Sequence, residues 1–367
     1  MQQRRLQLGQ LLRWRRLQLR QLLRRRRLRR RRQLVVLMTD TSYEGFFTLQ
    51  WHITHRCNLR CTHCYQDDYS AFEDRSSLEK ILDQYEALLK AYRWKGHINF
   101  TGGEPLLHPD LFWLLEEAGK RGITTAVLTN GTLIGLREAK RLRACGVDYV
   151  QVSLDGTERV HDAIRGKGSF QRAVKGIFAL RSQGIFTSVS FTAQRENLKE
   201  LPKLARYCDE IGANKLWYDR VIIPADEDVQ HLSLTTDDFI KLSRKAARLN
   251  RRYRVTCQRA LQFIPCKNKQ IYRCTAGESL LTILADGSVM ACRRLPITVG
   301  SVHDSDLLTI YNTSPELIAI RSAGLPEGCK GCDYAELCGG GARCVTYART
   351  GRYDLSDPDC LFAQEKR

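Results

Sequence analysis

Three cysteines lie close together in the first quarter of the chain, at Cys57, Cys61 and Cys64. The spacing Cys-x3-Cys-x2-Cys puts three thiols on one short loop after a strand-like run. Three thiolates hold three irons of a cubane cluster and leave the fourth iron open, and catalysis at a metal needs such an open position. A zinc site completed by His55 or His63 is the alternative that the spacing leaves open.

Three further polar stretches follow the cysteine loop in order. Residues 101–105 read Thr-Gly-Gly-Glu-Pro, residues 128–131 read Leu-Thr-Asn-Gly, and residues 152–156 read Val-Ser-Leu-Asp-Gly. Glycine lets the backbone approach a ligand closely, and a carboxylate accepts hydrogen bonds from an ammonium group. Taken singly, the Gly-Gly-Glu and Asn-Gly runs are also ordinary turn signals.

Most of the other cysteines gather in the last third of the chain. This C-terminal array consists of Cys266, Cys274, Cys292, Cys329, Cys332, Cys338, Cys344 and Cys360. In a chain without an export signal, clustered thiols indicate metal, either iron–sulfur clusters or two zinc knuckles. Cys145 and Cys208 fall on predicted helices, where we expect them to pack in apolar surroundings. Cys257 receives no role.

The elements that must position these residues alternate between strands and helices. We predict strands at 47–54, 98–100, 124–129, 148–154, 187–192 and 215–222. We predict helices at 78–92, 110–120, 136–145, 170–182, 198–211 and 235–252, the first with Ser76 and Ser77 as its cap region. Six successive βα units imply a parallel sheet. Polar residues at the strand ends favour a partial (β/α)6 TIM-like barrel, with an open doubly wound sheet as the alternative.

The pattern divides the chain into three parts. Residues 1–37 hold fourteen arginines and no acid, in an 11-residue repeat. This tail is either a basic arm for nucleic acid or an anionic membrane, or low-complexity sequence ahead of a true start at Met38, and we adopt the second interpretation. The α/β rhythm runs over 38–254, and the cysteine-rich part covers 255–367.

Composition excludes several classes of protein. The formal charge is +19, and 43% of the residues are hydrophobic, so the chain is not disordered as a whole. No uncharged apolar run reaches the ~18 residues of a membrane-spanning helix, and arginines interrupt the only leucine-rich start. We therefore expect a cytoplasmic protein with neither a membrane nor a nucleic acid as partner.

The motif Cys57-x3-Cys61-x-His63-Cys64, followed in order by the three polar stretches, resembles the signature of the radical S-adenosylmethionine (SAM) superfamily. The resemblance implies a [4Fe–4S] cluster whose open iron binds SAM. It also implies reductive cleavage of SAM to a 5′-deoxyadenosyl radical, which abstracts a hydrogen atom from the substrate. His63 stands where the family usually has an aromatic residue, next to the cofactor.

The same resemblance assigns SAM contacts to six other residues. These are Gly102, Gly103 and Glu104 for the amino group, Ser153 and Arg165 for the carboxylate, and Asn130 for a neighbouring polar contact. The structural alternatives are a turn at Asn130, a cap at Ser153 and an ion pair between Arg165 and Asp162.

The C-terminal array is similar to the SPASM domain that extends many radical SAM enzymes. The resemblance implies two auxiliary [4Fe–4S] clusters with interleaved ligands. One set is Cys266, Cys274, Cys292 and Cys344, and the other is Cys329, Cys332, Cys338 and Cys360. Five residues separate Cys338 from Cys344, where the family usually has three, so Cys344 is the ligand that this departure affects.

Enzymes with this extension often modify peptides or proteins, so we predict a peptide or protein maturase that cross-links or oxidises its substrate. The first alternative is an oxidase or decarboxylase of cofactor or tetrapyrrole biosynthesis. An alternative from another class is a non-catalytic zinc-binding adaptor for nucleic acid. Expected partners are an electron donor such as ferredoxin or flavodoxin, and a separate protein that presents a leader peptide, since no recognition domain fits between Met38 and Phe47.

The acid or base on the substrate side is predicted from position alone. Asp219 lies near the end of the sixth predicted strand and faces the mouth of the barrel in one register. Arg220 is its alternative, because a slip of one residue exchanges the two faces of a strand.

Overall fold

Short runs rich in β-branched and aromatic residues form one curved ten-stranded sheet in the computed structural model, which describes residues 45–66, 68–223, 228–256, 261 and 271–364. The strand order is β10-β9-β8-β1-β2-β3-β4-β5-β6-β7. The strands span β1 Gly45–His52, β2 Trp94–Thr101, β3 Thr124–Thr129, β4 Tyr149–Ser153, β5 Phe186–Ala193, β6 Lys215–Arg220, β7 Val255–Thr256, β8 Leu280–Ile283, β9 Ser288–Cys292 and β10 Leu295–Ser301.

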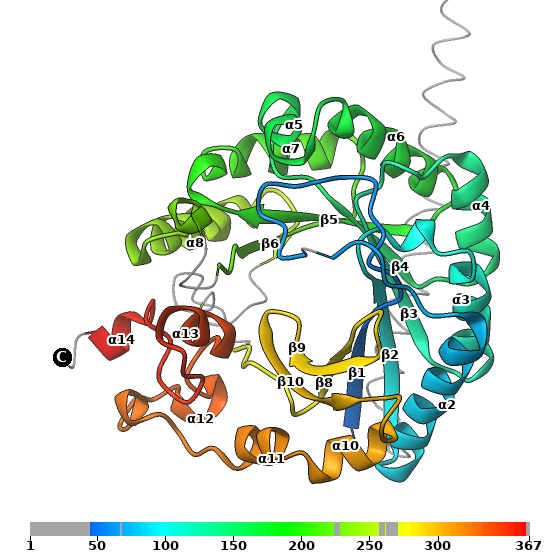
Figure 1. Ribbon diagram of the computed structural model, residues 1–367. Coiled ribbons are helices and arrows are strands. Elements are labelled where there is room, and N and C mark those ends of the chain that lie inside the picture. The colour runs from blue at the N-terminus through cyan, green and yellow to red at the C-terminus, as the bar shows by residue number, and fades with distance from the viewer. Residues whose placement is uncertain (1–44, 67, 224–227, 257–260, 262–270, 365–367) are drawn as a thin grey trace, which may run out of the picture. The chain divides into compact units, whose positions relative to one another are not determined.

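Each neighbouring pair of strands from β2 through β7 is parallel, and β8 pairs with β1 in parallel as well. Among the strands that the structure describes, β9 and β10 are the ones that pair antiparallel, β9 with β8 and β10 with β9. Helices cover its outer face, while the β8–β9–β10 segment curls inside the arc (Figure 1). This confirms the predicted partial barrel. The pairing of β8 with β1 also shows that the cysteine-rich part contributes a strand to the barrel's own sheet.

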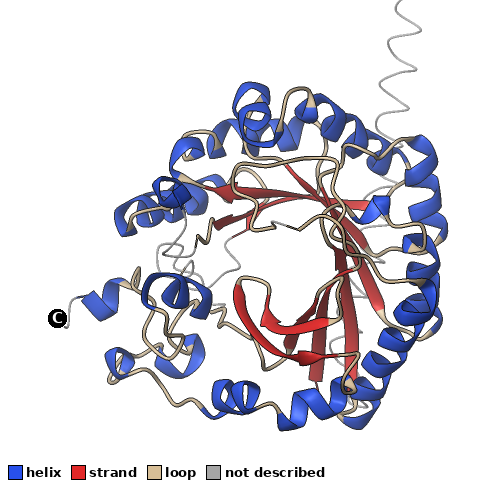
Figure 2. Cartoon of the chain, viewed as in Figure 1, coloured by secondary structure: helices blue, strands red, loops and turns tan. Residues whose placement is uncertain are grey.

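The helices follow the strands around the arc, as the colouring by secondary structure shows (Figure 2). They span α2 Arg75–Ala91, α3 Leu111–Lys120, α4 Leu136–Ala144, α5 Glu158–Arg165, α6 Ser169–Ser182, α7 Leu201–Glu210, α8 Thr236–Leu249, α10 Leu307–Thr313, α11 Pro315–Ser322, α12 Ala335–Cys338, α13 Arg343–Thr350 and α14 Leu361–Gln364. Short 3₁₀ turns lie at Pro105–Leu107, Arg195–Asn197, Asp228–Leu232 and Glu327–Cys329.

Most predicted elements have a counterpart within a few residues, and two differences concern helices of the α/β part. Helix α5 was not predicted as a separate element. Helix α2 begins earlier than expected, because Asp74 is its N-cap and accepts a hydrogen bond from the backbone N–H of Ser77. The serines expected to cap the helix therefore lie in its first turn.

One hydrophobic core runs through both parts of the described chain. Fully buried Phe47 of β1 stacks on Trp94 of β2, with ring centroids 5.1 Å apart. Tyr311, from α10 in the cysteine-rich part, meets both rings edge-on at 5.7 and 5.8 Å. The packing therefore continues across the boundary at 254/255, and residues from Phe46 onward form one compact unit.

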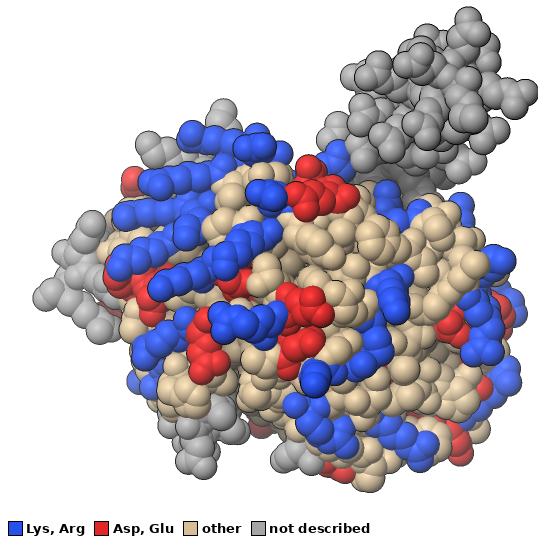
Figure 3. Space-filling view, turned by 90° about the horizontal axis from the view of Figure 1, so that it is seen from above, with Lys and Arg blue, Asp and Glu red and all other residues tan. Residues whose placement is uncertain are grey.

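The outer helices carry much of the positive charge. Exposed basic side chains lie on α7 and α8, including Lys203, Arg206, Lys241, Arg244 and Lys245. Figure 3 shows Lys and Arg gathered on this part of the surface. No described helix is both long and apolar enough to cross a membrane. The arginine-rich tail, Cys257 and Cys266 lie outside the described residues.

Candidate active site

The predicted site residues meet at the carboxyl edge of the sheet. The cysteine loop follows β1, the Gly-Gly-Glu stretch follows β2, and Asn130 follows β3. Ser153 is the last residue of β4, and Asp219 lies one residue before the end of β6. In barrels of this kind the carboxyl ends of the parallel strands are where chemistry occurs, so the fold brings together what the sequence separates by more than 150 residues.

Two glycines join the cysteine loop to β2. The N–H of Gly103 donates to the carbonyl of Thr54, and the N–H of Glu104 donates to that of Arg56, both at 2.8 Å. A Cβ on Gly102, whose φ is +146°, would lie 2.2 Å from the Thr54 oxygen, and one on Gly103 would lie 2.4 Å from the Arg56 oxygen. The glycines therefore permit a close approach of the chain to itself, directly ahead of the first cysteine.

The three thiols of the loop lie near one another. Cys57 and Cys61 are half-buried and Cys64 is exposed. A hydrogen bond from Cys64 N–H to the Cys61 carbonyl (3.1 Å) and one from Thr62 N–H to the Ile164 carbonyl (3.0 Å) fix the loop. Burial raises the pKa of Cys57, and it raises that of Cys61 to about 11, with the neighbouring thiolates adding to the rise.

This donor set fits a cluster with one open iron. Three thiols converge, and one of them faces solvent, which leaves room for a further ligand on that side. His55 instead lies 3.4 Å from Asp68. Within the described ranges, no three His, Cys, Asp or Glu side chains surround a single-ion position, so neither His55 nor His63 completes a mononuclear zinc site there.

Behind Cys61 lies a buried ion pair. Asp155 accepts hydrogen bonds from Nε of Arg165 and from the backbone N–H of Thr192 (2.9 Å). Nη1 of Arg165 lies 3.8 Å from the Cys61 sulfur. Burial alone would raise the pKa of Asp155, but the Arg165 charge holds it below its usual value. Arg165 thus bridges a carboxylate and a cysteine of the loop.

The structural alternative for Arg165, an ion pair with Asp162, is wrong, because Arg165 pairs with Asp155. Asp162 instead accepts hydrogen bonds from the backbone N–H groups of Gly168 (2.6 Å) and Phe170 (2.9 Å), at the start of α6. A carboxylate at a helix N-terminus satisfies donors that have no partner within the helix.

His63 lies on the same side of the loop. Its Nε2 is 3.9 Å from the Asp155 carboxylate, and its Nδ1 has no hydrogen-bond partner among the described residues. Burial lowers the pKa of His63 to about 4, against the opposing pull of the Asp155 charge. The imidazole is therefore neutral at physiological pH, and its role toward the cofactor stays a prediction.

Glu104 is fully buried beneath the loop. Its carboxylate accepts hydrogen bonds from the Thr129 hydroxyl (2.7 Å), the Asn130 N–H (2.8 Å) and the Leu106 N–H (3.2 Å). Burial raises the pKa of Glu104 to about 7, although these hydrogen bonds act in the other direction. Glu104 therefore ties the end of β2 to the end of β3, and only its remaining acceptor capacity is left for an ammonium group.

Asn130 connects β3 to the cysteine loop. Its side-chain N–H donates to the Asn58 amide oxygen (2.9 Å), and Asn58 in turn donates to the Thr132 hydroxyl (2.9 Å). Ser153 lies half-buried at the end of β4, in register with Ser190 of β5. Sequence reasoning did not single out Asn58 or Asp155, although Asp155 lies inside the stretch quoted for Ser153.

The two candidates on β6 are both held in ion pairs. Asp219 pairs with Arg294, and its other oxygen accepts the N–H of Arg220 at 2.9 Å. Arg220 pairs with Asp357 and Asp359. Both β6 side chains are buried. The structure thus directs them toward the cysteine-rich part of the chain, and a role for Asp219 as acid or base stays a prediction.

The C-terminal cysteines separate into two groups in space. Cys344 is buried, and its pKa is raised to about 12, first by burial and then by the charges of Cys274 and Cys292, against the opposing charge of Arg294. Cys344 therefore lies near Cys274 and Cys292 despite the longer spacing before it. Cys266, the fourth member expected here, falls outside the described ranges.

The second group forms around Cys338. Burial raises the pKa of Cys338 to about 11, with the charges of Cys360 and Cys329 adding to the effect. Cys329 and Cys332 share one turn, in which the N–H of Cys332 donates to the carbonyl of Cys329 at 3.1 Å. All twelve described cysteines are free thiols, so no disulfide among them competes for these positions.

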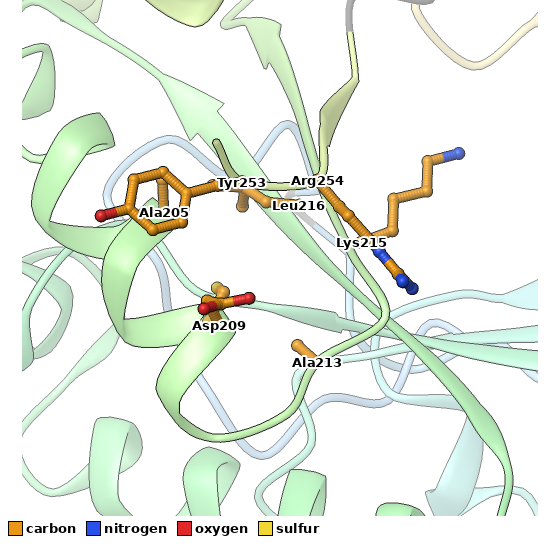
Figure 4. Close-up of a pocket in the computed structure, with 8 residues that line it drawn as sticks. Ala205, Asp209, Ala213, Lys215, Leu216, Tyr253 and Arg254 are labelled. Atoms are coloured by element: carbon orange, nitrogen blue, oxygen red, sulfur yellow. The ribbon is translucent and has the colours of Figure 1, made fainter. Parts of the chain in front are cut away.

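Two cysteines lie apart from these groups. Cys208 of α7 is buried and apolar in its packing, as expected, whereas the Cys145 thiol lies 3.4 Å from a Glu116 oxygen. A small pocket beside Cys208 lies between α7, the first residues of β6 and the two residues that precede β7, with Lys215 and Arg254 among its lining residues (Figure 4). It lies at the amino ends of these strands, away from the three-thiol loop.

Comparison with known families agrees with this geometry. The model of the radical SAM superfamily matches residues 51–208, and the SPASM model, described as an iron–sulfur cluster-binding domain, matches residues 274–333. The first range contains the three-thiol loop, and the second contains four cysteines of the C-terminal array.

Several curated enzymes align with most of the chain. An AdoMet-dependent heme synthase of Nitratidesulfovibrio vulgaris is 28% identical over 341 residues, which cover 86% of this chain and 92% of that protein. A PqqA peptide cyclase of Gluconobacter oxydans is 26% identical over 333 residues, covering 85% of this chain and 89% of that protein.

Solved structures share the fold. The protein anSMEcpe, solved with bound AdoMet and Cp18Cys peptide, superposes with a TM-score of 0.72 at 19% identity over 88% of this chain and 95% of that one. SuiB of Streptococcus suis, bound to its precursor peptide SuiA, gives a TM-score of 0.68 at 18% identity over 90% and 79%.

The matched families fix the cofactors and the class of protein. The cofactors are SAM and [4Fe–4S] clusters, and the curated relatives named above are a synthase and a cyclase, both enzymes. The chain is therefore an enzyme of the radical SAM superfamily that carries a SPASM domain after its radical SAM domain.

Proposed function

We propose that this enzyme takes a hydrogen atom from a peptide or protein substrate, in a cross-linking or oxidative maturation reaction. The observation that carries the proposal is the three-thiol loop at the carboxyl edge of a barrel that aligns over most of its length with a peptide cyclase. When bound at this loop, the reduced cluster and SAM supply a carbon radical that abstracts hydrogen.

The chain's own residues define how that chemistry is held. Cys57, Cys61 and Cys64 would bind three irons, and Asp155 fixes the Arg165 guanidinium against Cys61. We assign Ser153 and Arg165 to the SAM carboxylate, since both lie at the same edge as the thiols. The SAM ammonium would meet the Gly102–Glu104 turn, where Glu104 keeps part of its acceptor capacity.

The C-terminal cysteines would hold two auxiliary clusters, which the proximity of Cys344 to Cys274 and Cys292, and of Cys338 to Cys329 and Cys360, supports. Such clusters can take up the second electron of an oxidation that begins with hydrogen abstraction, or bind the substrate. An electron donor such as ferredoxin or flavodoxin would supply the first electron.

Cleavage of SAM tests the first part of the proposal. In the anaerobically reconstituted enzyme with SAM and dithionite, Cys57→Ala should abolish 5′-deoxyadenosine formation and leave the auxiliary iron bound, because the C-terminal thiols are unchanged. Cys145→Ala is the matched control and should cleave SAM like the wild type, since Cys145 lies outside both cysteine groups. Cleavage at the wild-type rate by Cys57→Ala would contradict the assignment of the loop.

A tetrapyrrole substrate is the second candidate, because the AdoMet-dependent heme synthases align over as much of the chain as the peptide cyclases. The two substrates give different products. A peptide that is encoded beside the gene and co-expressed with the enzyme should lose hydrogen atoms in pairs, as read by mass spectrometry. Release of carbon dioxide from a propionate-bearing porphyrin, without any change in the peptide, would favour the tetrapyrrole instead.

A further inference from the structure

The end of β6 forms ion pairs with the cysteine-rich part of the chain on both of its faces. Asp219 and Arg220 are adjacent, so their side chains leave the strand in opposite directions. Asp219 pairs with Arg294, which lies two residues after Cys292. Arg220 pairs with Asp357 and Asp359, which lie just before Cys360. Each ion pair thus ends beside a cysteine of the C-terminal array.

Arg220 is the more deeply buried of these anchors. Its side chain is 4% exposed, and both partner carboxylates are 0% exposed. Nη2 donates to Asp357 at 2.6 Å, Nη1 pairs with Asp359, and the guanidinium lies 4.2 Å from the centroid of the Phe239 ring. A planar guanidinium can serve two carboxylates and a ring face together, whereas an ammonium group cannot.

Asp357 links this arginine to the glycine-rich insertion between Cys338 and Cys344. Its carboxylate accepts the N–H of Ala342 at 2.9 Å, at the start of α13, and its own N–H donates to the Gly340 carbonyl at 2.8 Å. Gly341 has φ of +92°, and a Cβ there would lie 2.4 Å from the Asp357 Cβ. The longer spacing is thus folded around Asp357, with glycine where the carboxylate packs.

Asp359 adds two further elements to the same cluster. It accepts hydrogen bonds from Arg349 of α13 and from the Thr236 hydroxyl of α8, each at 2.7 Å. The barrel strand β6, helix α8, helix α13 and the loop before Cys360 therefore meet at one pair of carboxylates.

We propose that Arg220 is a positioning residue for the auxiliary cluster held by Cys329, Cys332, Cys338 and Cys360. Through Asp357 and Asp359 it fixes the two chain segments that carry Cys338 and Cys360 to the strand that ends at the mouth of the barrel. This inference rests on the cluster assignment proposed above. On this proposal, the insertion at residues 339–343 and the Asp-Pro-Asp-Cys segment at residues 357–360 together hold this cluster at a defined place relative to the three-thiol loop.

The test isolates the auxiliary iron. In a full-length parent variant with Cys57, Cys61 and Cys64 changed to Ala, all bound iron belongs to the C-terminal cysteines. Into this parent we would introduce Arg220→Lys, which keeps the positive charge but removes the planar guanidinium. A second variant carries the triple change Arg220→Met, Asp357→Asn and Asp359→Asn. The triple variant removes the charges together, so that no buried carboxylate is left unpaired. Arg206→Met, at an exposed pair with Glu210, is the control.

The measurements are iron per chain and the EPR spectrum of the reduced protein, with circular dichroism to verify folding. Both Arg220 variants should fold, lose the iron of one auxiliary cluster, and lose or shift its EPR signal, while the control matches the parent. Folded Arg220 variants with the parent's iron content and spectrum would overturn the proposal. A parent that binds no iron would overturn it by a different route, because the assignment of the C-terminal cysteines would fail, whereas SAM cleavage by the wild-type enzyme would still support the first loop.

Discussion

Arg165 touches both a buried carboxylate and a cysteine of the three-thiol loop, so its charge acts directly on the site. A positive group 3.8 Å from the Cys61 sulfur stabilises extra negative charge on a cluster bound there. The same guanidinium is held in place by Asp155, which has no exposed surface.

Replacing this charge should make the first cluster harder to reduce. We expect Arg165→Met to lower the midpoint potential and to slow SAM cleavage by about 10–100-fold, and the double variant Arg165→Met, Asp155→Asn to shift the potential less, because it also removes the opposite charge beside Cys61. An EPR-monitored redox titration measures the potential, and Arg137→Met, at an exposed pair with Glu138, is the control. An unchanged potential in Arg165→Met would show that the guanidinium does not act on the cluster.

Two buried histidines make stability depend on pH. Burial lowers the pKa of His52 to about 3 and that of His161 to about 4, whereas both return to about 6.5 on unfolding. Their contribution is therefore fully present above about pH 6.5 and is lost as the pH falls toward their folded values. Each group should cost about 1.4 kcal/mol of unfolding free energy by about pH 5.5.

The difference between wild type and a variant isolates one of these histidines. His161→Asn keeps an acceptor for the Asp155 N–H, which lies 3.1 Å from His161 Nδ1, and removes the titrating ring. Denaturant unfolding at about pH 7.5 and about pH 5.5 should show the smaller loss in the variant. If both proteins lost the same unfolding free energy between these pH values, the pKa of His161 would not change on unfolding.

At the residue scale, the sequence predicts the cysteine ligands better than it predicts the ion pairs and hydrogen bonds that hold the site together. Cys57, Cys61 and Cys64 stand at a readable spacing, and the Gly-Gly-Glu turn follows one βα unit later. The partners of Arg165 and Arg220 are not readable in the same way. Arg220 and Asp357 are 137 residues apart, and no local pattern joins a strand end to a loop so distant.

At the scale of elements, the turn after β2 depends on having no side chain at two positions. Gly103→Ala would place a methyl group 2.4 Å from the Arg56 carbonyl oxygen, so the backbone ahead of Cys57 must move. We expect the variant to lose the iron of the first cluster and to cleave SAM at least 10-fold more slowly, on the order expected when a positioned group shifts by about 1 Å.

Gly119→Ala is the matched control for this glycine. Gly119 lies within α3, and a Cβ there meets nothing within 4 Å. The Gly119→Ala variant should therefore bind as much iron as the wild type, and its helix α3 should be more stable by about 0.5–1 kcal/mol. Normal iron content in Gly103→Ala would show that the turn can yield without moving the thiols.

Elements escaped prediction where burial is polar or pairing is distant. The buried face of α5 consists of His161, Ile164 and Arg165, so an apolar period is missing although the helix is well formed. β8 is a four-residue run, Leu280–Ile283, that is buried at three positions and shows no alternation, and its parallel pairing with β1 depends on the closure of the whole arc.

At the scale of the molecule, the radical SAM and SPASM parts share one sheet and one core. Tyr311 of α10 is 5% exposed, packs against Phe47 and Trp94, and donates a hydrogen bond to the Glu278 carbonyl at 2.8 Å. We therefore expect Tyr311→Ala to destabilise the whole protein by about 3–5 kcal/mol and to leave a single unfolding transition.

Differential scanning calorimetry of the anaerobic protein measures both quantities. Tyr334→Ala is the control, since Tyr334 is 39% exposed and stacks only on the ring of Phe362 among the aromatic contacts described. Two separate transitions in Tyr311→Ala, with one unchanged from the wild type, would show that the two parts unfold independently.

The parallel pairing of β1 with β8 has a consequence for synthesis on the ribosome. β1 is among the first elements to emerge, yet the strand that covers its outer edge is not translated until Leu280 is reached. Until then the nascent barrel presents an open edge flanked by Phe47, Leu49 and Trp51, side chains that are fully buried at the end. Productive folding must therefore wait for the cysteine-rich part, and chaperones that shield exposed strand edges should govern the yield of this enzyme in a heterologous host.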